Sequence, residues 1–209
     1  MYSPPAFREE RVEVMHALMR AHPLAMLITA GEGGLIANPV PFSVVGTAGN
    51  GLLRAHIAAA NDQLPALRSG TEALVVFQGP QAYVTPSWYP SKREHGRVVP
   101  TWNYVVVQAR GIATVIDDPA WLHAQVSALT AEREHGRAAP WQVEDAPESF
   151  VAAQMKGIVG LEIPIARLEG KWKISQNRAD ADRLGVADGL RGEGTAPDMA
   201  ALVGTAGRR

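Results

Sequence analysis

The sequence predicts a mixed α+β fold in which six to seven mostly antiparallel strands form a β-barrel with peripheral helices. Three observations support this prediction. Short apolar runs are separated by Gly, Pro and Asn, the residues that end strands and form turns. The run at 102–116 alternates between two faces and is long enough to curl around a barrel. Between these runs lie segments with helical spacing or with residues that start helices.

The first half of the chain is expected to contain two helices and four strands. Residues 7–21 carry apolar side chains at helical spacing, and Pro23 ends that segment. The expected strands are 24–29, 35–45, 52–57 and 73–78 with an extension at 83–85 after a turn at Gly79-Pro80. Pro39 and Pro41 cannot donate to a strand ladder, so the second strand is expected at an edge or a bulge. A short helix is expected at 61–68, with a polar cap and a start that favours an anion.

The second half is expected to continue with strands and three helices. The expected elements are a solvated loop at 92–99, a strand at 102–116, a helix from Asp118 to Gly136, a helix at 148–156, strands at 158–165 and 172–175, and a charged helix at 177–190. Asp118 followed by Pro119 is typical of a helix start. Residues 1–190 are expected to form a single domain. Residues 191–209 are rich in Gly and Ala and are expected to form a flexible tail.

Composition excludes several classes of protein. The chain has 209 residues, 46% of them apolar and 20% charged, which is enough to bury a full core. Its net charge of -1 gives no basic footprint for nucleic acid or an anionic membrane. Cys is absent, so disulfides, thiolate metal sites and cysteine nucleophiles are excluded. A charged N-terminal segment and the lack of a long apolar stretch lead us to expect a cytoplasmic protein.

Catalytic and metal-binding motifs are also missing. The sequence has no Gly-x-Ser-x-Gly, Walker, Gly-x-Gly-x-x-Gly or His-Glu-x-x-His motif. The segment Arg-Glu-His-Gly-Arg occurs at 93–97 and again at 133–137, but His95 and His135 lack the spacing of metal ligands, so no metal site is expected. Aromatic residues gather around 74–116, where they can serve a core, an interface or a flat ligand.

Three segments carry a resemblance to a known family. FQGPQAYVTPSWY (77–89), VPTWNY (99–104) and KGIVGLEI with EGKWKISQNR (156–178) resemble the PaiB-like family of FMN-binding negative transcriptional regulators. The resemblance covers about residues 1–190. It implies the FMN-binding split-barrel fold, FMN as cofactor, and a homodimer with flavin sites at its interface. It also implies a role in DNA regulation, directly or through a partner.

The resemblance implies a set of cofactor-binding residues. By analogy with split barrels, the flavin phosphate is expected at His56, Ile57, Asn61 and Gln63, the flavin ring near Asn38 and Pro39 with Gln78, Trp102 and Asn103, and the closing C-terminal segment at Lys173, Gln176 and Asn177. The sequence departs from the family at Pro39, where a His is usual, at Ala60, where no cation precedes Asn61, and at Asp62. These changes are expected to weaken phosphate binding through charge-assisted hydrogen bonds.

Other interpretations of these residues stay open. Trp102 can be a core or dimer-interface residue, and Lys171 and Lys173 can form a solvated strand face. Three alternative functions are therefore considered, from the most to the least expected. The first is an FMN-binding repressor. The second is a flavin-dependent oxidoreductase of the pyridoxamine-phosphate-oxidase-like class. The third is a non-catalytic haem- or flavin-binding protein.

Overall fold

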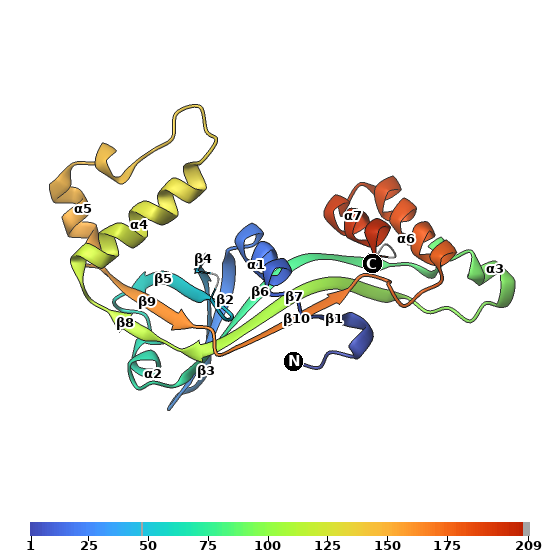
Figure 1. Ribbon diagram of the computed structural model, residues 1–209, viewed down its shortest axis with the longest axis horizontal. Helices are drawn as coiled ribbons and strands as arrows, with labels where there is room; N and C mark the ends of the chain where they lie inside the picture. Colours follow the sequence, from blue (N-terminus) through green and yellow to red (C-terminus); the bar gives the residue numbers. More distant parts are fainter. Residues whose placement is uncertain (47, 207–209) are drawn as a thin grey trace. The chain divides into compact units, whose positions relative to one another are not determined.

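A computed structural model describes residues 1–46 and 48–206 of the chain (Figure 1). The strands are β1 (Arg8–Glu9), β2 (Leu24–Gly31), β3 (Gly34–Pro41), β4 (Ser43–Val45), β5 (Leu52–Ala58), β6 (Glu72–Val84), β7 (Thr101–Ile112), β8 (Thr114–Ile116), β9 (Ile158–Pro164) and β10 (Arg167–Lys173). The helices are α1 (Val12–Ala21), α2 (Leu64–Arg68), α3 (Ser91–His95), α4 (Pro119–Glu134), α5 (Glu148–Met155), α6 (Asp180–Glu193) and α7 (Pro197–Thr205). Short 3-10 helices are η1 (Pro5–Phe7), η2 (Pro86–Trp88) and η3 (Val143–Asp145). The predicted α+β class is confirmed, with ten strands among the described residues where six to seven were expected.

Contacts within the chain cluster in two compact units. The central unit comprises 19–77 and 108–168, and the terminal unit comprises 1–18, 78–107 and the chain from Glu169 onward. Strands β6 and β7 run from one unit into the other along the chain. The single domain expected at 1–190 stays a prediction, and the two units are described separately below.

The central unit is built on antiparallel strands. Its sheets contain β6-β2-β3 and β4-β5-β9-β8 in those orders. Strand β5 pairs with β9 from Leu52 opposite Pro164 to Ala58 opposite Ile158. Alternate residues of both strands are buried because successive side chains point to opposite faces of a sheet. Helix α4 lies against β5 and β9, and the ring of Trp121 lies on Gly160, where a Cβ would come within 2.2 Å of it.

Two predicted strands are each divided in the structure. Residues 35–45 form β3 and β4 in different sheets, because Phe42 between them is buried and its N–H bonds the carbonyl oxygen of Pro23. Residues 102–116 likewise form β7 and β8 in different sheets. The expected edge position of the strand with Pro39 and Pro41 is confirmed, since β3 ends its sheet.

The predicted turn at Gly79-Pro80 is wrong. Strand β6 continues through both residues. Gly79 is in close contact with Leu18 and Val105, and a Cβ there would lie 2.6 Å from the Leu18 side chain. Strand β2 pairs with residues 74–76 of β6, so the missing N–H of Pro80 falls outside that ladder.

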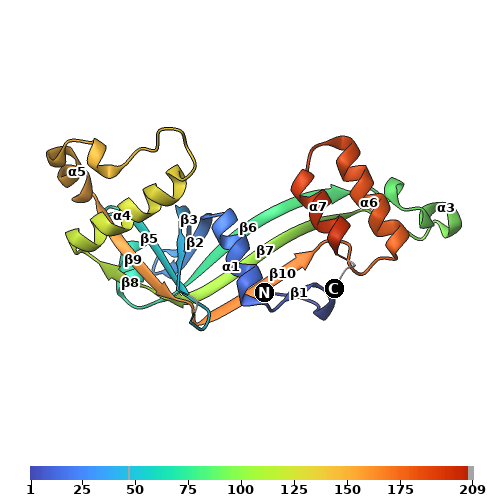
Figure 2. The same ribbon diagram turned by 45° about the horizontal axis from the view of Figure 1, so that its top comes forward.

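The terminal unit combines the strand order β1-β10-β7-β6 with the paired helices α6 and α7. These helices lie side by side in both views (Figures 1 and 2) and bury Val186, Leu190, Met199 and Val203. The buried Arg183 donates to two carbonyl oxygens at the end of α7 and forms an ion pair with Asp180 at 3.0 Å, which compensates its charge.

The helices show where local sequence signals were sufficient to predict a helix and where they were not. Asp118 caps α4 as predicted, with Oδ1 accepting from the Ala120 N–H at 3.0 Å. The expected loop at 92–99 contains α3, and the expected tail from Arg191 contains the end of α6 and the partly buried α7. The tail is helical there because α6 offers an apolar face, and residues 207–209 lie outside the described part. No helix among the described residues is long and apolar enough to cross a membrane.

Candidate functional site

The predicted cofactor-binding residues fall into two sets. The central set comprises Asn38, Pro39, His56, Ile57, Asn61 and Gln63. The terminal set comprises Gln78, Trp102, Asn103, Lys173, Gln176 and Asn177.

Gln63 is the structural centre of the central set. Its side chain is fully buried, and Nε2 lies 3.0 Å from the Leu27 carbonyl oxygen, 3.2 Å from Thr29 Oγ1 and 3.2 Å from the Ile36 carbonyl oxygen. Its Oε1 accepts from Asn38 Nδ2 at 3.0 Å. The amide therefore ties the start of α2 to β2 and β3, and both Asn38 and Gln63 are occupied within the protein.

The junction between β5 and α2 offers few donors to a phosphate. The Gln63 N–H donates to Asn61 Oδ1 at 2.9 Å, and the Leu64 N–H donates to the Asn61 carbonyl oxygen at 3.0 Å. The next residue, Pro65, has no N–H. Ile57 is buried in the core and Pro39 is exposed on the edge strand. The polar cap predicted for the helix at 61–68 is wrong. Helix α2 begins only at Leu64, its N-cap residue Gln63 makes no side-chain cap hydrogen bond, and Asn61 holds the turn before it.

His56 differs from its neighbours because it keeps a free polar atom. It lies on β5 opposite Gly160, and its Nδ1 is buried without a hydrogen-bond partner among the described residues. Burial lowers the pKa of His56 below its ordinary value. A neutral imidazole can offer one hydrogen bond to a ligand but no positive charge for a phosphate.

The lowered pKa of His56 predicts a loss of stability in mild acid. Below the ordinary histidine pKa of about 6.5 the unfolded chain takes up a proton more readily than the folded chain. This contribution to stability is therefore complete above that pH and is lost as the pH falls toward the folded pKa. Urea unfolding across this range should show a shallower decline for His56→Gln than for the parent. Substituting the exposed His95 should leave the decline unchanged, and an equal decline in His56→Gln would contradict the prediction.

An open aromatic hollow forms part of the terminal unit. Trp102 is half exposed, its Nε1 donates to Gln81 Oε1, and its ring meets Tyr83 edge to face at 5.8 Å. With Gln78 and Tyr104, the Trp102 and Gln81 side chains line a hollow of about 270 Å³. The hollow thus presents flat apolar faces beside side-chain amides.

The opposite face of β7 fixes the segment after β10. Buried Asn103 donates from Nδ2 to Ser175 Oγ at 2.9 Å. Ser175 has φ 63°, the one left-handed conformation of a non-glycine residue in the described chain. Gln176 closes this turn, since its Oε1 accepts from the Ile174 N–H at 2.8 Å and its Nε2 donates to the Trp172 carbonyl oxygen. Asn177 is exposed.

Three cations converge beside this turn. Lys173 Nζ donates to Thr101 Oγ1 and, at 2.7 Å, to the Trp102 carbonyl oxygen. Burial, together with the nearby charges of Lys171 and Arg178, lowers the pKa of Lys173 against an opposing effect of Tyr104. Lys171 is 7% exposed and donates to the Tyr2 carbonyl oxygen at 3.2 Å, so it is not part of a solvated face. Within the described residues, no ion pair joins any of the three cations to a carboxylate.

Sequence reasoning missed several members of this group. Gln81, Tyr104, Lys171 and Arg178 were not among the predicted binding residues. Lys171 and Lys173 alternate along one strand, so both were expected to share a face, and this spacing was the available signal. The burial of Lys171 depends on Tyr2 and Tyr104, whose rings lie 5.6 Å and 5.1 Å from its Nζ. That contact is invisible in the sequence.

The terminal group fits the chemistry of a flat ligand with an anionic group. Lys171 is buried and Lys173 and Arg178 are half-buried, and none of the three has a carboxylate partner among the described residues. Cations that are partly removed from water are usually paired, so this group favours a phosphate. Aromatic faces and amides suit a planar heterocycle with polar edges. FMN contains both parts, and the residues present fit it.

Comparisons with known proteins show the family of the chain and its cofactor. The family model described as "Putative FMN-binding domain" matches residues 1–167. An uncharacterized protein of Emericella nidulans is 35% identical, with 93% of this chain and 92% of the relative covered. Protease synthase and sporulation protein PAI 2 of Bacillus subtilis is 29% identical, with 92% and 90% covered. The solved structure of the FAD and heme binding protein from Mycobacterium smegmatis has a TM-score of 0.59 at 21% identity, with 79% of this chain and 73% of that chain covered.

The fold is that of the FMN-binding split barrels, as the resemblance predicted. The chain belongs to the family of FMN-binding domains named above, and FMN is the cofactor that this family assignment gives.

Proposed function

We propose that this protein is a homodimeric, cytoplasmic FMN-binding regulator that lowers transcription. The observation that carries FMN binding is the convergence of Lys171, Lys173 and Arg178 in the unit that holds the aromatic hollow, with no carboxylate partner among the described residues. The regulatory part is supported by the Bacillus subtilis relative, whose name refers to protease synthesis and sporulation.

The residues of the terminal unit take separate roles in this proposal. Lys173 and Arg178 would hold the phosphate, with the charge of Lys171 behind them. Trp102 and Tyr104 would contact the flavin ring, and Gln78 would bond its polar edge. Asn103 and Gln176 hold the turn, and Asn177 is available to the ligand. When bound, FMN would supply electron transfer, while the protein orients it and excludes water. In the central set, His56 has the free polar atom, and its part in binding stays a prediction.

The residues that line the hollow favour flavin binding over a reaction catalysed by protein side chains. Its residues are Gln78, Gln81, Trp102, Tyr104, Val105 and Val106. His, Asp, Glu and Lys are absent from this lining, and Tyr104 is its one side chain of a type that serves as a general acid or base. A regulator needs only to bind the flavin, and flavin binding then changes the affinity of the protein for its partner. An oxidoreductase would have to rely on FMN itself and on its second substrate.

Purified protein reconstituted with FMN tests the proposal. We expect a bound-flavin spectrum, a dimer mass by light scattering, and specific retention of fragments of the source genome in gel shifts at physiological salt. DNA affinity should differ between the FMN-loaded and FMN-free forms. Absent or purely non-specific DNA binding would overturn the regulatory role. Steady NAD(P)H oxidation under the same conditions would instead establish the oxidoreductase. Calorimetric binding of haem without FMN binding would establish the third function.

A further inference from the structure

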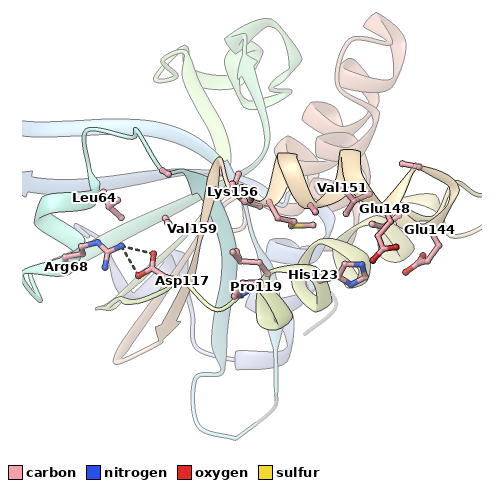
Figure 3. A pocket seen from close by; sticks show the side chains of 17 residues that line it. Leu64, Arg68, Asp117, Pro119, His123, Glu144, Glu148, Val151, Lys156 and Val159 are labelled. Carbon is pink, nitrogen blue, oxygen red and sulfur yellow. Dashed lines mark hydrogen bonds and ion pairs between the residues drawn. The ribbon is translucent and has the colours of Figure 1, made fainter.

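A second cavity lies in the central unit. None of the predicted flavin-binding residues is among those that line it, although Ala59 and Leu64, at the junction of β5 and α2, are part of its wall. It has a volume of about 880 Å³ and lies among α2, α4, η3, α5 and the start of β9 (Figure 3). Its walls are mainly apolar and include Leu64, Leu122, Val143, Val151, Met155 and Val159. Small-molecule sites usually occupy roughly 300–1,000 Å³ and are lined in this way. The proposed flavin function does not use this cavity.

Charged side chains stand at the two ends of the cavity. At one end, Arg68 Nη2 bonds both carboxylate oxygens of Asp117 at 2.8 and 3.0 Å, so their charges compensate each other. At the other end, Figure 3 shows Glu144 and Glu148 together beside His123. Neither Glu has an ion-pair partner among the residues that the structure describes.

The acidic end is therefore open to a cation. Two adjacent carboxylates repel each other, and a cationic group between them relieves that repulsion. The remaining charge of the lining is Lys156, which follows the last residue of α5, whereas Glu148 is the first residue of that helix. Arg68 and Asp117 compensate each other. The other charged residues of the lining, which form no ion pair with any described residue, carry two negative charges and one positive charge.

We propose that this cavity binds an amphiphilic amine, with an apolar body along the helix walls and a terminal ammonium group at Glu144 and Glu148. An alkylammonium group remains charged near neutral pH, as the lysine side chain does. The apolar wall accounts for affinity, and the carboxylate pair selects amines over acids and alcohols of the same length. Each additional buried methylene group should tighten binding about fourfold.

Calorimetry with octylamine, octanol and octanoate tests this site in the FMN-loaded protein. Octylamine should bind more tightly than octanol, and octanoate should bind most weakly. In the double variant Glu144→Gln with Glu148→Gln, the affinity for octylamine should fall by roughly fivefold. This factor is modest because both carboxylates are solvent-exposed. Octanol affinity should stay the same. Equal affinities for the three probes in the parent would overturn the charge selection.

Two neighbouring residues of α5 provide a matched pair of steric variants. Ala152 lines the cavity and Ala153 does not, although both are exposed helix positions. Ala152→Trp should abolish octylamine binding, whereas Ala153→Trp should preserve it. FMN affinity should be unchanged in both, so failure of this site can be distinguished from failure of the proposed function. Displacement of octylamine by FMN, or its equal binding to both variants, would place the amine elsewhere and overturn the proposal. If raising the protein concentration displaces octylamine, the cavity would instead be occupied by a second copy of the chain, which would also overturn the proposal.

Discussion

Replacing Lys173 by methionine is expected to weaken FMN binding by roughly tenfold to a hundredfold, because hydrogen bonds to charged groups contribute about 1.5–3 kcal/mol each. Lys173 already lies beside two further cations, and burial lowers its pKa. Removing its ammonium group takes away one donor to the phosphate but retains most of the side-chain volume. Fluorescence titration with FMN measures the loss directly.

A parallel titration with riboflavin distinguishes the contribution of the phosphate to affinity from that of the flavin ring. It lacks the phosphate, so its affinity should stay within about twofold in Lys173→Met if the ammonium group acts on that group alone. Trp102→Ala should weaken FMN and riboflavin alike, since it removes a ring contact. Lys92→Met, at an exposed lysine of α3, serves as the control and should change neither. An equal loss of riboflavin affinity in Lys173→Met would show that Lys173 does not recognise the phosphate.

Gln63→Leu is expected to lower the free energy of unfolding by roughly 2–4 kcal/mol, because it leaves several buried polar groups unsatisfied. The Gln63 amide bonds Leu27, Thr29, Ile36 and Asn38, and the side chain is fully buried. Leucine has a similar volume, so the loss comes from the hydrogen bonds and not from a cavity. Urea unfolding followed by circular dichroism gives the difference.

A second buried glutamine provides the control for this substitution. Gln125 on α4 is 5% exposed, and its Nε2 has no hydrogen-bond partner among the described residues. Gln125→Leu should therefore be neutral or slightly stabilising, since it removes an unsatisfied donor. Similar losses for the two substitutions would show that the Gln63 network adds nothing beyond side-chain packing.

Local signals in the sequence predicted the elements that depend on nearby residues. Asp118 and Pro119 marked the start of α4, and Pro39 with Pro41 marked an edge strand. The same local reasoning failed at Gly79, where contact with Leu18 and Val105 keeps the backbone extended. It also failed at α7, whose helical state depends on burying Met199 and Val203 with α6.

The candidate site likewise depends partly on local sequence and partly on tertiary contacts. The sequence by itself determined the α+β class, the family and FMN as cofactor, because long ungapped motifs and apolar periodicity are properties of the chain alone. Only the tertiary structure decided which predicted residues are free to bind. It directs Asn38 and Gln63 to each other and gathers Lys171, Lys173 and Arg178. It also leaves His56 Nδ1 without a hydrogen-bond partner in the part of the chain that the structure describes. The physical reason is that hydrogen bonds and burial depend on neighbours that lie far away in the chain.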